Sequence, residues 1–206
     1  MHWPVIIAIV WGVGLVWSGI APFDRATWAM EVAPCVVAAP LLMLTARRAP
    51  LTPLLYALIL AHGIVLIVGG AYSYARVPAG FLVQDLFDLS RNPYDKLGHF
   101  MQGFVPAVAA RELLLRWGGM ARGGWLVAAV VLSCLGISAV YEIIEWGAAA
   151  ALGQGADEFL GTQGYECDTQ SDMLLAGIGA IAALAILSRL HDRQLGRVAG
   201  FPLSRE

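Results

Sequence analysis

The sequence predicts an all-α membrane protein, a single-domain bundle of six transmembrane helices with both termini in the cytoplasm. Of its 206 residues, 59% are hydrophobic and 14% are charged, and the mean hydropathy is +0.70. Soluble domains are about 25% charged. Six apolar stretches approach the roughly 20 residues that cross a bilayer. The uneven distribution of Lys and Arg among the connections gives the orientation.

The predicted spans are 3–20, 28–45, 51–72, 95–117, 124–151 and 168–190. Short connections at 21–27, 46–50 and 118–123 pair their neighbours as antiparallel hairpins. The longer connections 73–94 and 152–167 are predicted as outer loops. The N-terminal stretch has no basic region and no small-residue cleavage site, which favours a retained first span over a removed signal peptide.

Most of the positive charge lies on one side of this six-span topology. Nine of the 13 Lys and Arg residues are there: Arg47, Arg48, Arg111, Arg116, Arg122, Arg189, Arg193, Arg197 and Arg205. The positive-inside rule assigns this side to the cytoplasm. Twelve of the 15 acidic residues lie on the other side, so the outer surface is expected to be acidic.

Polar residues recur at one depth of three spans. Asp95, His99 and Gln102 follow at i, i+4 and i+7 and share one helix face. At about 1.5 Å per residue, His99 lies about 6 Å inside the outer edge. Glu142 and Glu145 come about 27 Å after the inner end of their span, near the outer edge of a hydrocarbon core about 30 Å thick. These residues therefore lie in the outer third of the membrane.

The last span adds Asp168 and Asp172, one turn apart at its outer end. Ionisable residues at membrane depth usually face the bundle interior. We therefore expect one outward-facing acidic pocket, lined by Asp95, His99, Gln102, Glu142, Glu145, Asp168 and Asp172.

The charges in this pocket predict a cation. Five carboxylates face only His99 and Lys96, so repulsion in a low dielectric favours a divalent metal over protonated carboxyls. Carboxylates with one imidazole suit Mg²⁺, Mn²⁺, Ca²⁺ or Zn²⁺. The predicted metal ligands are His99, Asp95, Glu142, Glu145, Asp168 and Asp172. A metal-activated water with a carboxylate base would make His99, Glu142 and Glu145 the catalytic residues.

Four further residues are candidates for substrate contacts: Gln102, Lys96, Asp157 and Gln163. Asp157 and Gln163 lie in the glycine-rich connection 152–167. The composition of this connection fits a lid over the site and an ordinary surface loop equally well. Asp95 and Asp168 have a plainer interpretation as helix N-caps.

Elsewhere the structural interpretations are favoured. Arg111 and Glu112 are expected to fix the depth of the fourth span, His62 to be structural, and Glu31 to be peripheral. The cysteines Cys35, Cys134 and Cys167 match neither a disulfide framework nor a zinc spacing.

Three motifs resemble a known family. The segments 94–104 (YDKLGHFMQGF), 141–146 (YEIIEW) and 159–173, which contains FLGTQG and DTQSDM, are similar to the YjdF type of bacterial inner-membrane protein. This resemblance covers the last two thirds of the chain and implies an inner-membrane location. VanZ-like proteins are more distantly similar in Asp95, Lys96, His99 and Phe100 and in the pair at 168 and 172. Their link to teicoplanin resistance implies handling of an envelope component, although 141–146 departs from their pattern.

The sequence thus predicts a metal-dependent membrane enzyme, a hydrolase or transferase acting on a lipid-linked or phosphorylated envelope substrate. The alternatives are a proton- or cation-coupled transporter and a non-catalytic protein with a structural cation site. Expected partners are membrane lipids, and the chain has no basic tract for nucleic acid. The absence of an internal repeat and of a polar path to the cytoplasm disfavours transport.

Overall fold

The computed structural model describes residues 2–152, 163 and 165–198, and this part of the chain is all helical. The described helices are α1 (Trp3–Ile20), α2 (Arg25–Thr45), α3 (Pro53–Ala71), α4 (Pro78–Phe87), α5 (Tyr94–Arg116), α6 (Gly124–Leu152) and α8 (Asp168–Leu195). The predicted all-α class is confirmed for these residues.

Five of the described helices, α1, α2, α3, α6 and α8, are long and apolar enough to cross a membrane. Helix α5 has 23 residues, a sufficient length, but it carries charges near both ends. They belong to Asp95, Lys96, Arg111, Glu112 and Arg116. A crossing by α5, and with it the six-span topology with cytoplasmic termini, stays a prediction.

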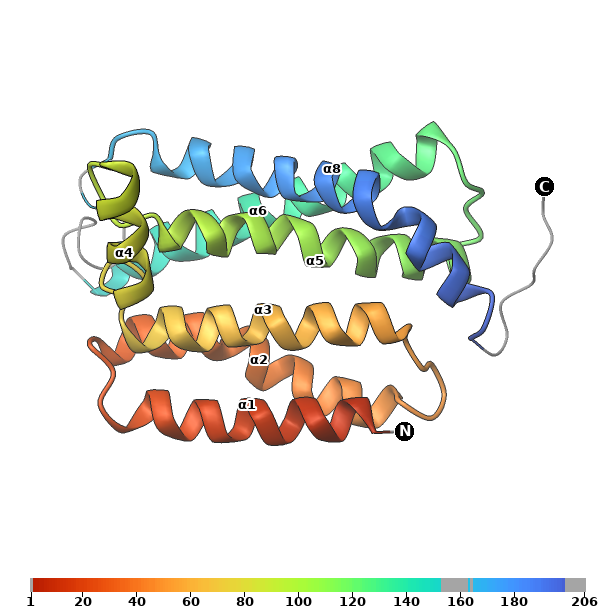
Figure 1. Ribbon diagram of the computed structural model, residues 1–206, viewed down its shortest axis with the longest axis horizontal. Coiled ribbons are helices and arrows are strands. Elements are labelled where there is room, and N and C mark those ends of the chain that lie inside the picture. The colour runs from red at the N-terminus through yellow and green to blue at the C-terminus, as the bar shows by residue number, and fades with distance from the viewer. Residues whose placement is uncertain (1, 153–162, 164, 199–206) are drawn as a thin grey trace.

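The long helices form two groups that lie side by side (Figure 1). Helices α1, α2 and α3 pack on one another, and α5 packs against α6 and most extensively against α8. Contacts between α3 and α5 join the groups. Helix α5 therefore occupies the centre of the bundle, where its polar residues meet other helices.

Small residues let α5 and α8 approach closely. A Cβ on Gly103 would overlap the carbonyl of Ala176, and one on Gly179 would overlap the carbonyl of Phe100. Substituting either glycine would force the two backbones apart. This close contact fixes the register that places the start of α5 beside the start of α8.

The prediction that 73–94 is a loop was wrong, because the segment contains helix α4. This helix begins at Pro78 and ends at Phe87, and the residue after it, Asp88, has a left-handed conformation with φ 50°. Its 10 residues are too few for a span signal. The buried side chain of Asn92 holds this segment, because its amide donates to Val77 O at 3.0 Å and a Cβ on Gly80 would overlap it.

Candidate functional site

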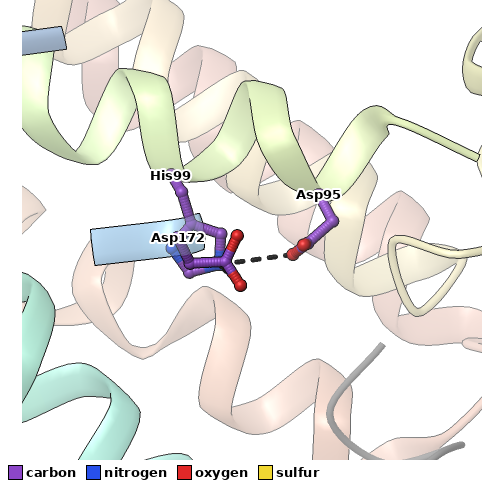
Figure 2. Close-up of side chains that lie close together, drawn as sticks. All are labelled: Asp95, His99 and Asp172. Atoms are coloured by element: carbon purple, nitrogen blue, oxygen red, sulfur yellow. Dashed lines mark ion pairs between the residues drawn. The ribbon is translucent and has the colours of Figure 1, made fainter. Parts of the chain in front are cut away.

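A buried polar cluster forms where α5 and α8 begin. Asp95 and His99 project from α5 toward Asp172 of α8 (Figure 2), and their exposed fractions are 6%, 7% and 2%. His99 Nε2 lies 3.3 Å from Asp95 Oδ1 and 3.6 Å from Asp172 Oδ2. One ligand atom from each residue lies within 4.8 Å of the others, a spacing that could hold a metal ion. Half of the predicted metal ligands are thus brought together.

The second nitrogen of His99 fixes the orientation of its ring. His99 Nδ1 lies 3.2 Å from Gln102 Oε1, and an amide oxygen can only accept a hydrogen bond. Nδ1 therefore carries a hydrogen, and Nε2 is directed at the two carboxylates. Gln102 is thus placed to position the imidazole, and its predicted contact with substrate stays a prediction.

Two carboxylate oxygens in the cluster are buried and have no hydrogen-bond partner: Asp95 Oδ2 and Glu142 Oε1. Their closest charged neighbours are Lys96 Nζ, 3.5 Å from Asp95 Oδ2, and His99 Nδ1, 3.8 Å from Glu142 Oε1. Buried polar atoms in native proteins are nearly always satisfied, and the exceptions are typical of ligand and ion sites. Glu142 thus lies next to the three grouped residues, and its Oε1 is available to accept a hydrogen bond or bind a cation.

Lys96 and Arg91 form ion pairs with Asp168. Asp168 Oδ1 accepts from Arg91 Nη1 at 2.7 Å and from Lys96 Nζ at 2.8 Å. Lys96 also donates to Asp172 Oδ1 at 2.6 Å and to Ser171 Oγ at 2.8 Å. Asp172 therefore bridges Lys96 and His99, and Lys96, predicted as a substrate contact, lies within an ion-pair network.

The N-cap interpretation of Asp95 and Asp168 was wrong. The cap positions are Pro93 for α5 and Cys167 for α8, and neither helix start has a side-chain cap. Both aspartates lie inside the first turn, where their carboxylates face other side chains. Each helix begins earlier than the capping interpretation requires.

Glu145 lies apart from the three grouped residues, on the wall of a cavity that also reaches Asp95 and His99. Glu31 of α2 lines the same cavity and accepts from Tyr141 OH through Oε2 at 3.2 Å. We expected Glu31 to have only a peripheral role, but its side chain lines the cavity next to the cluster. Its signal was available, since Glu31 comes about 9 Å into its helix, in the same outer third as the other acids.

Tyr74 closes the polar end of this cavity from the connection between α3 and α4. Its ring packs where a Cβ on Gly69 or Gly98 would overlap it. Burial, reinforced by the nearby Glu31 carboxylate, raises the pKa of Tyr74 well above its ordinary value. The phenol therefore stays protonated and can donate a hydrogen bond.

The connection 152–167 contributes one described candidate. Gln163 Oε1 accepts from Asn92 N at 3.2 Å, and Gln163 Nε2 donates to Asn92 O at 3.1 Å. These bonds tie the connection to the segment before α5, and the predicted substrate contact of Gln163 stays a prediction. Asp157 lies outside the described residues.

A second buried polar cluster lies at the opposite end of α5. Glu112 is 0% exposed and accepts from Thr52 Oγ1 at 2.8 Å, Arg116 Nη1 at 2.7 Å and His191 Nε2 at 3.0 Å. Arg111 Nη1 donates to His191 Nδ1 at 3.0 Å. Sequence reasoning missed this cluster, having assigned Arg111 and Glu112 only to helix depth.

The fold and the buried cluster define a helical membrane protein with an ionisable group of residues inside the bundle. Residues 3–193 match the family described as "Predicted membrane protein (DUF2238)", to which the chain belongs. It is 58% identical over 184 residues to "Inner membrane protein YjdF" of Escherichia coli (strain K12), which covers 89% of this chain and 88% of that relative. No solved structure matches it.

These matches confirm the YjdF-type resemblance and show that the chain is a multi-pass protein of the bacterial inner membrane. The likeness to VanZ-like proteins stays a prediction. Neither description states a reaction, so the function is argued from the site.

Proposed function

We propose that the chain is a metal-dependent membrane enzyme whose divalent cation is bound by Asp95, His99 and Asp172. The observation that carries this proposal is the direction of His99 Nε2, which points at two buried carboxylates while Nδ1 is bonded to Gln102. In a neutral ring with its hydrogen on Nδ1, the Nε2 lone pair would face two carboxylates, and a cation among the three would remove that repulsion. Histidine ligands characteristically use the second nitrogen in this way.

The donor set favours particular metals. Imidazole suits Zn²⁺ and other transition metals, whereas Mg²⁺ and Ca²⁺ favour oxygen ligands alone. Zn²⁺ and Mn²⁺ are therefore preferred among the four predicted ions. Three protein ligands leave positions for water and substrate, as in catalytic zinc sites.

Glu142 is the best-placed base. Its Oε1 lies beside the His99 ring and has no hydrogen-bond partner. A bound metal would supply a water of lowered pKa. In hydrolysis that water would add to the substrate centre and pass a proton to Glu142, which would give the proton to the leaving group as its bond breaks. Transfer follows the same course with an acceptor hydroxyl replacing the water.

The proposed substrate is a lipid-linked or phosphorylated component of the cell envelope. The inner-membrane location of the family supports this class, as does the predicted outward orientation of the α5 start. Glu145 lines the cavity next to the cluster and is a further candidate for a substrate contact or a second base.

A structural ion cluster is the second candidate function. It is favoured by Lys96 and Arg91, whose two charges balance those of Asp168 and Asp172. A protonated His99 would then satisfy Asp95. A proton path is disfavoured, because an apolar layer with Val108, Val130 and Ala180 lies in the core along α5, α6 and α8.

Metal analysis of the purified protein tests the proposal. Wild-type protein purified without chelator, or loaded with Zn²⁺ or Mn²⁺ and then desalted, should retain one ion per chain, and Asp172→Asn should not. Asp192→Asn is the matched control, because this acid lies on the same helix at the opposite cluster and its side chain is 33% exposed. Failure of wild-type protein to retain either ion would refute the metal site.

A further inference from the structure

The cavity beside the cluster of Asp95, His99 and Asp172 lies between the two helix groups. It is lined by residues of α1, α2, α3, α5 and α6 and has a volume of about 320 Å³. Pockets for small molecules span about 300–1,000 Å³, whereas voids in packed interiors rarely exceed a water molecule. The cavity is therefore of ligand size.

The lining of this cavity changes from polar to apolar along α5. From the start of the helix the wall is formed by Asp95, His99 and Gln102, and further along by Val105 and Ala109. At about 1.5 Å per residue this wall is about 21 Å long. One helix thus presents ionisable groups at one end and hydrocarbon toward its middle.

Two other helices show the same change in the same direction. On α2, Thr27 and Glu31 are followed by Pro34 and Ala38, and on α6, Ile137 precedes Tyr141 and Glu145. Helices α2 and α5 begin, and α6 ends, at the end of the bundle where α4 lies (Figure 1). The polar residues of the three helices therefore face one end of the cavity.

Most polar atoms in the apolar half are bonded to backbone. Trp11 Nε1 donates to Leu60 O at 3.2 Å, and Cys35 Sγ donates to Gly63 O at 3.7 Å. His62 Nε2 is the exception, buried and without a hydrogen-bond partner. The described side chains of this half therefore offer a ligand mainly hydrocarbon, with His62 Nε2 as an unpartnered polar atom.

We infer that the cavity binds the hydrocarbon chain of an amphiphilic lipid, with the polar head at the Asp95, His99 and Asp172 cluster. A purely polar substrate would make no favourable contacts with the apolar half of the cavity. A purely apolar substrate would remove water from the carboxylates without offering them a polar partner. The inference rests on the proposed function in one respect: a phosphate head meets acidic residues and needs the metal as counter-ion.

Photo-crosslinking tests this inference. The full chain is reconstituted in vesicles of phosphatidylethanolamine and phosphatidylglycerol, with a diazirine-bearing chain on a trace lipid. One arm uses phosphatidylglycerol as that lipid and the other uses a polyprenyl phosphate, which separates two sources of a phosphate-headed chain. Labelling is read at Cys35 and Val105, which are 1% and 3% exposed and out of reach of bulk lipid.

We expect labelling of both residues in at least one arm and a several-fold loss in Ala109→Phe, which narrows the apolar half. Ala128→Phe, on an exposed position of α6, should label as the wild type does. Wild-type protein labelled only at exposed positions in both arms would overturn the inference, even if Ala109→Phe failed to fold. Equal labelling of Ala109→Phe and wild type would overturn it too.

The outcomes also separate this inference from the proposed function. Labelled Cys35 and Val105 in protein that binds no metal would keep the lipid site and refute the metal proposal. Metal retention without labelling would keep the metal site and refute the lipid site.

Discussion

The two buried clusters on α5 and α8 contain similar residues, but they differ in how fully their carboxylates are hydrogen-bonded. Each places a histidine against a carboxylate, in one case His191 with Glu112 and in the other His99 with Asp95. Glu112 has donors from three side chains and a backbone amide, including Thr52 N at 3.1 Å. Asp95 Oδ2 has no hydrogen-bond partner. The satisfied cluster is suited to stabilising the bundle, and the cluster with the unpaired oxygen is the one for which we propose a ligand.

The two histidines also differ in the nitrogen that carries hydrogen. Arg111 can only donate, so its bond to His191 Nδ1 leaves the hydrogen on Nε2, which donates to Glu112. In His99 the hydrogen is on Nδ1, bonded to Gln102, and Nε2 faces Asp95 and Asp172. One imidazole completes a hydrogen-bond chain, and the other directs its second nitrogen at two carboxylates.

The largest expected effect is on stability, from Glu112→Ala. Removing this carboxylate leaves the buried Arg116 and His191 without their shared partner, which costs about 3–5 kcal/mol. Thermal unfolding in detergent, followed by helical circular dichroism, measures the loss. A variant as stable as wild type would contradict the structural role of this cluster.

His99→Ala and Asp172→Asn should abolish metal binding with a smaller loss of stability than Glu112→Ala. Loss of a direct ligand should weaken affinity by more than the about 100-fold upper range for residues that only orient ligands. Zinc titration against a competing chelator measures the affinity. If either variant bound zinc like wild type, its residue would not be a ligand.

Gln102→Leu should lower zinc affinity by about 10–100-fold, because the His99 ring loses the acceptor that orients it. Gln102→Glu, which keeps an acceptor oxygen, should retain most of the affinity. The same titration distinguishes this positioning role from a packing role, for which Leu and Glu would have the opposite order.

Arg122→Ala should have the smallest effect. Arg122 Nε contacts Asp192 Oδ1 at 3.2 Å, and the two side chains are 48% and 33% exposed. Solvent screening limits such a pair to about 0–1 kcal/mol. A loss as large as that of Glu112→Ala would show that the satisfied cluster extends to the surface.

The sequence predicted the features that depend on composition and periodicity. Helix α1 has the bounds of the first predicted stretch, and α8 begins at the predicted Asp168. The shared depth of Asp95, His99 and Asp172 followed from counting residues along helices. None of these features depends on which helices touch.

Features that depend on helix packing were not predictable in the same way. Glu31 reaches the cavity because α2 packs on α3, which in turn packs on α5. No local sequence pattern encodes these contacts between helices. The pairing of Glu112 with His191 joins residues 79 positions apart. Lys96 and Asp172 pair across the glycine contact of α5 with α8, which the charge count alone could not place.

X-ray absorption at the zinc edge tests the metal site most directly. Zinc-loaded wild-type protein should show one imidazole nitrogen at about 2.0–2.1 Å together with oxygen ligands, and His99→Gln should lose the imidazole contribution. An imidazole signal unchanged in His99→Gln, or a zinc ion with only oxygen ligands in wild type, would contradict the Asp95, His99 and Asp172 site.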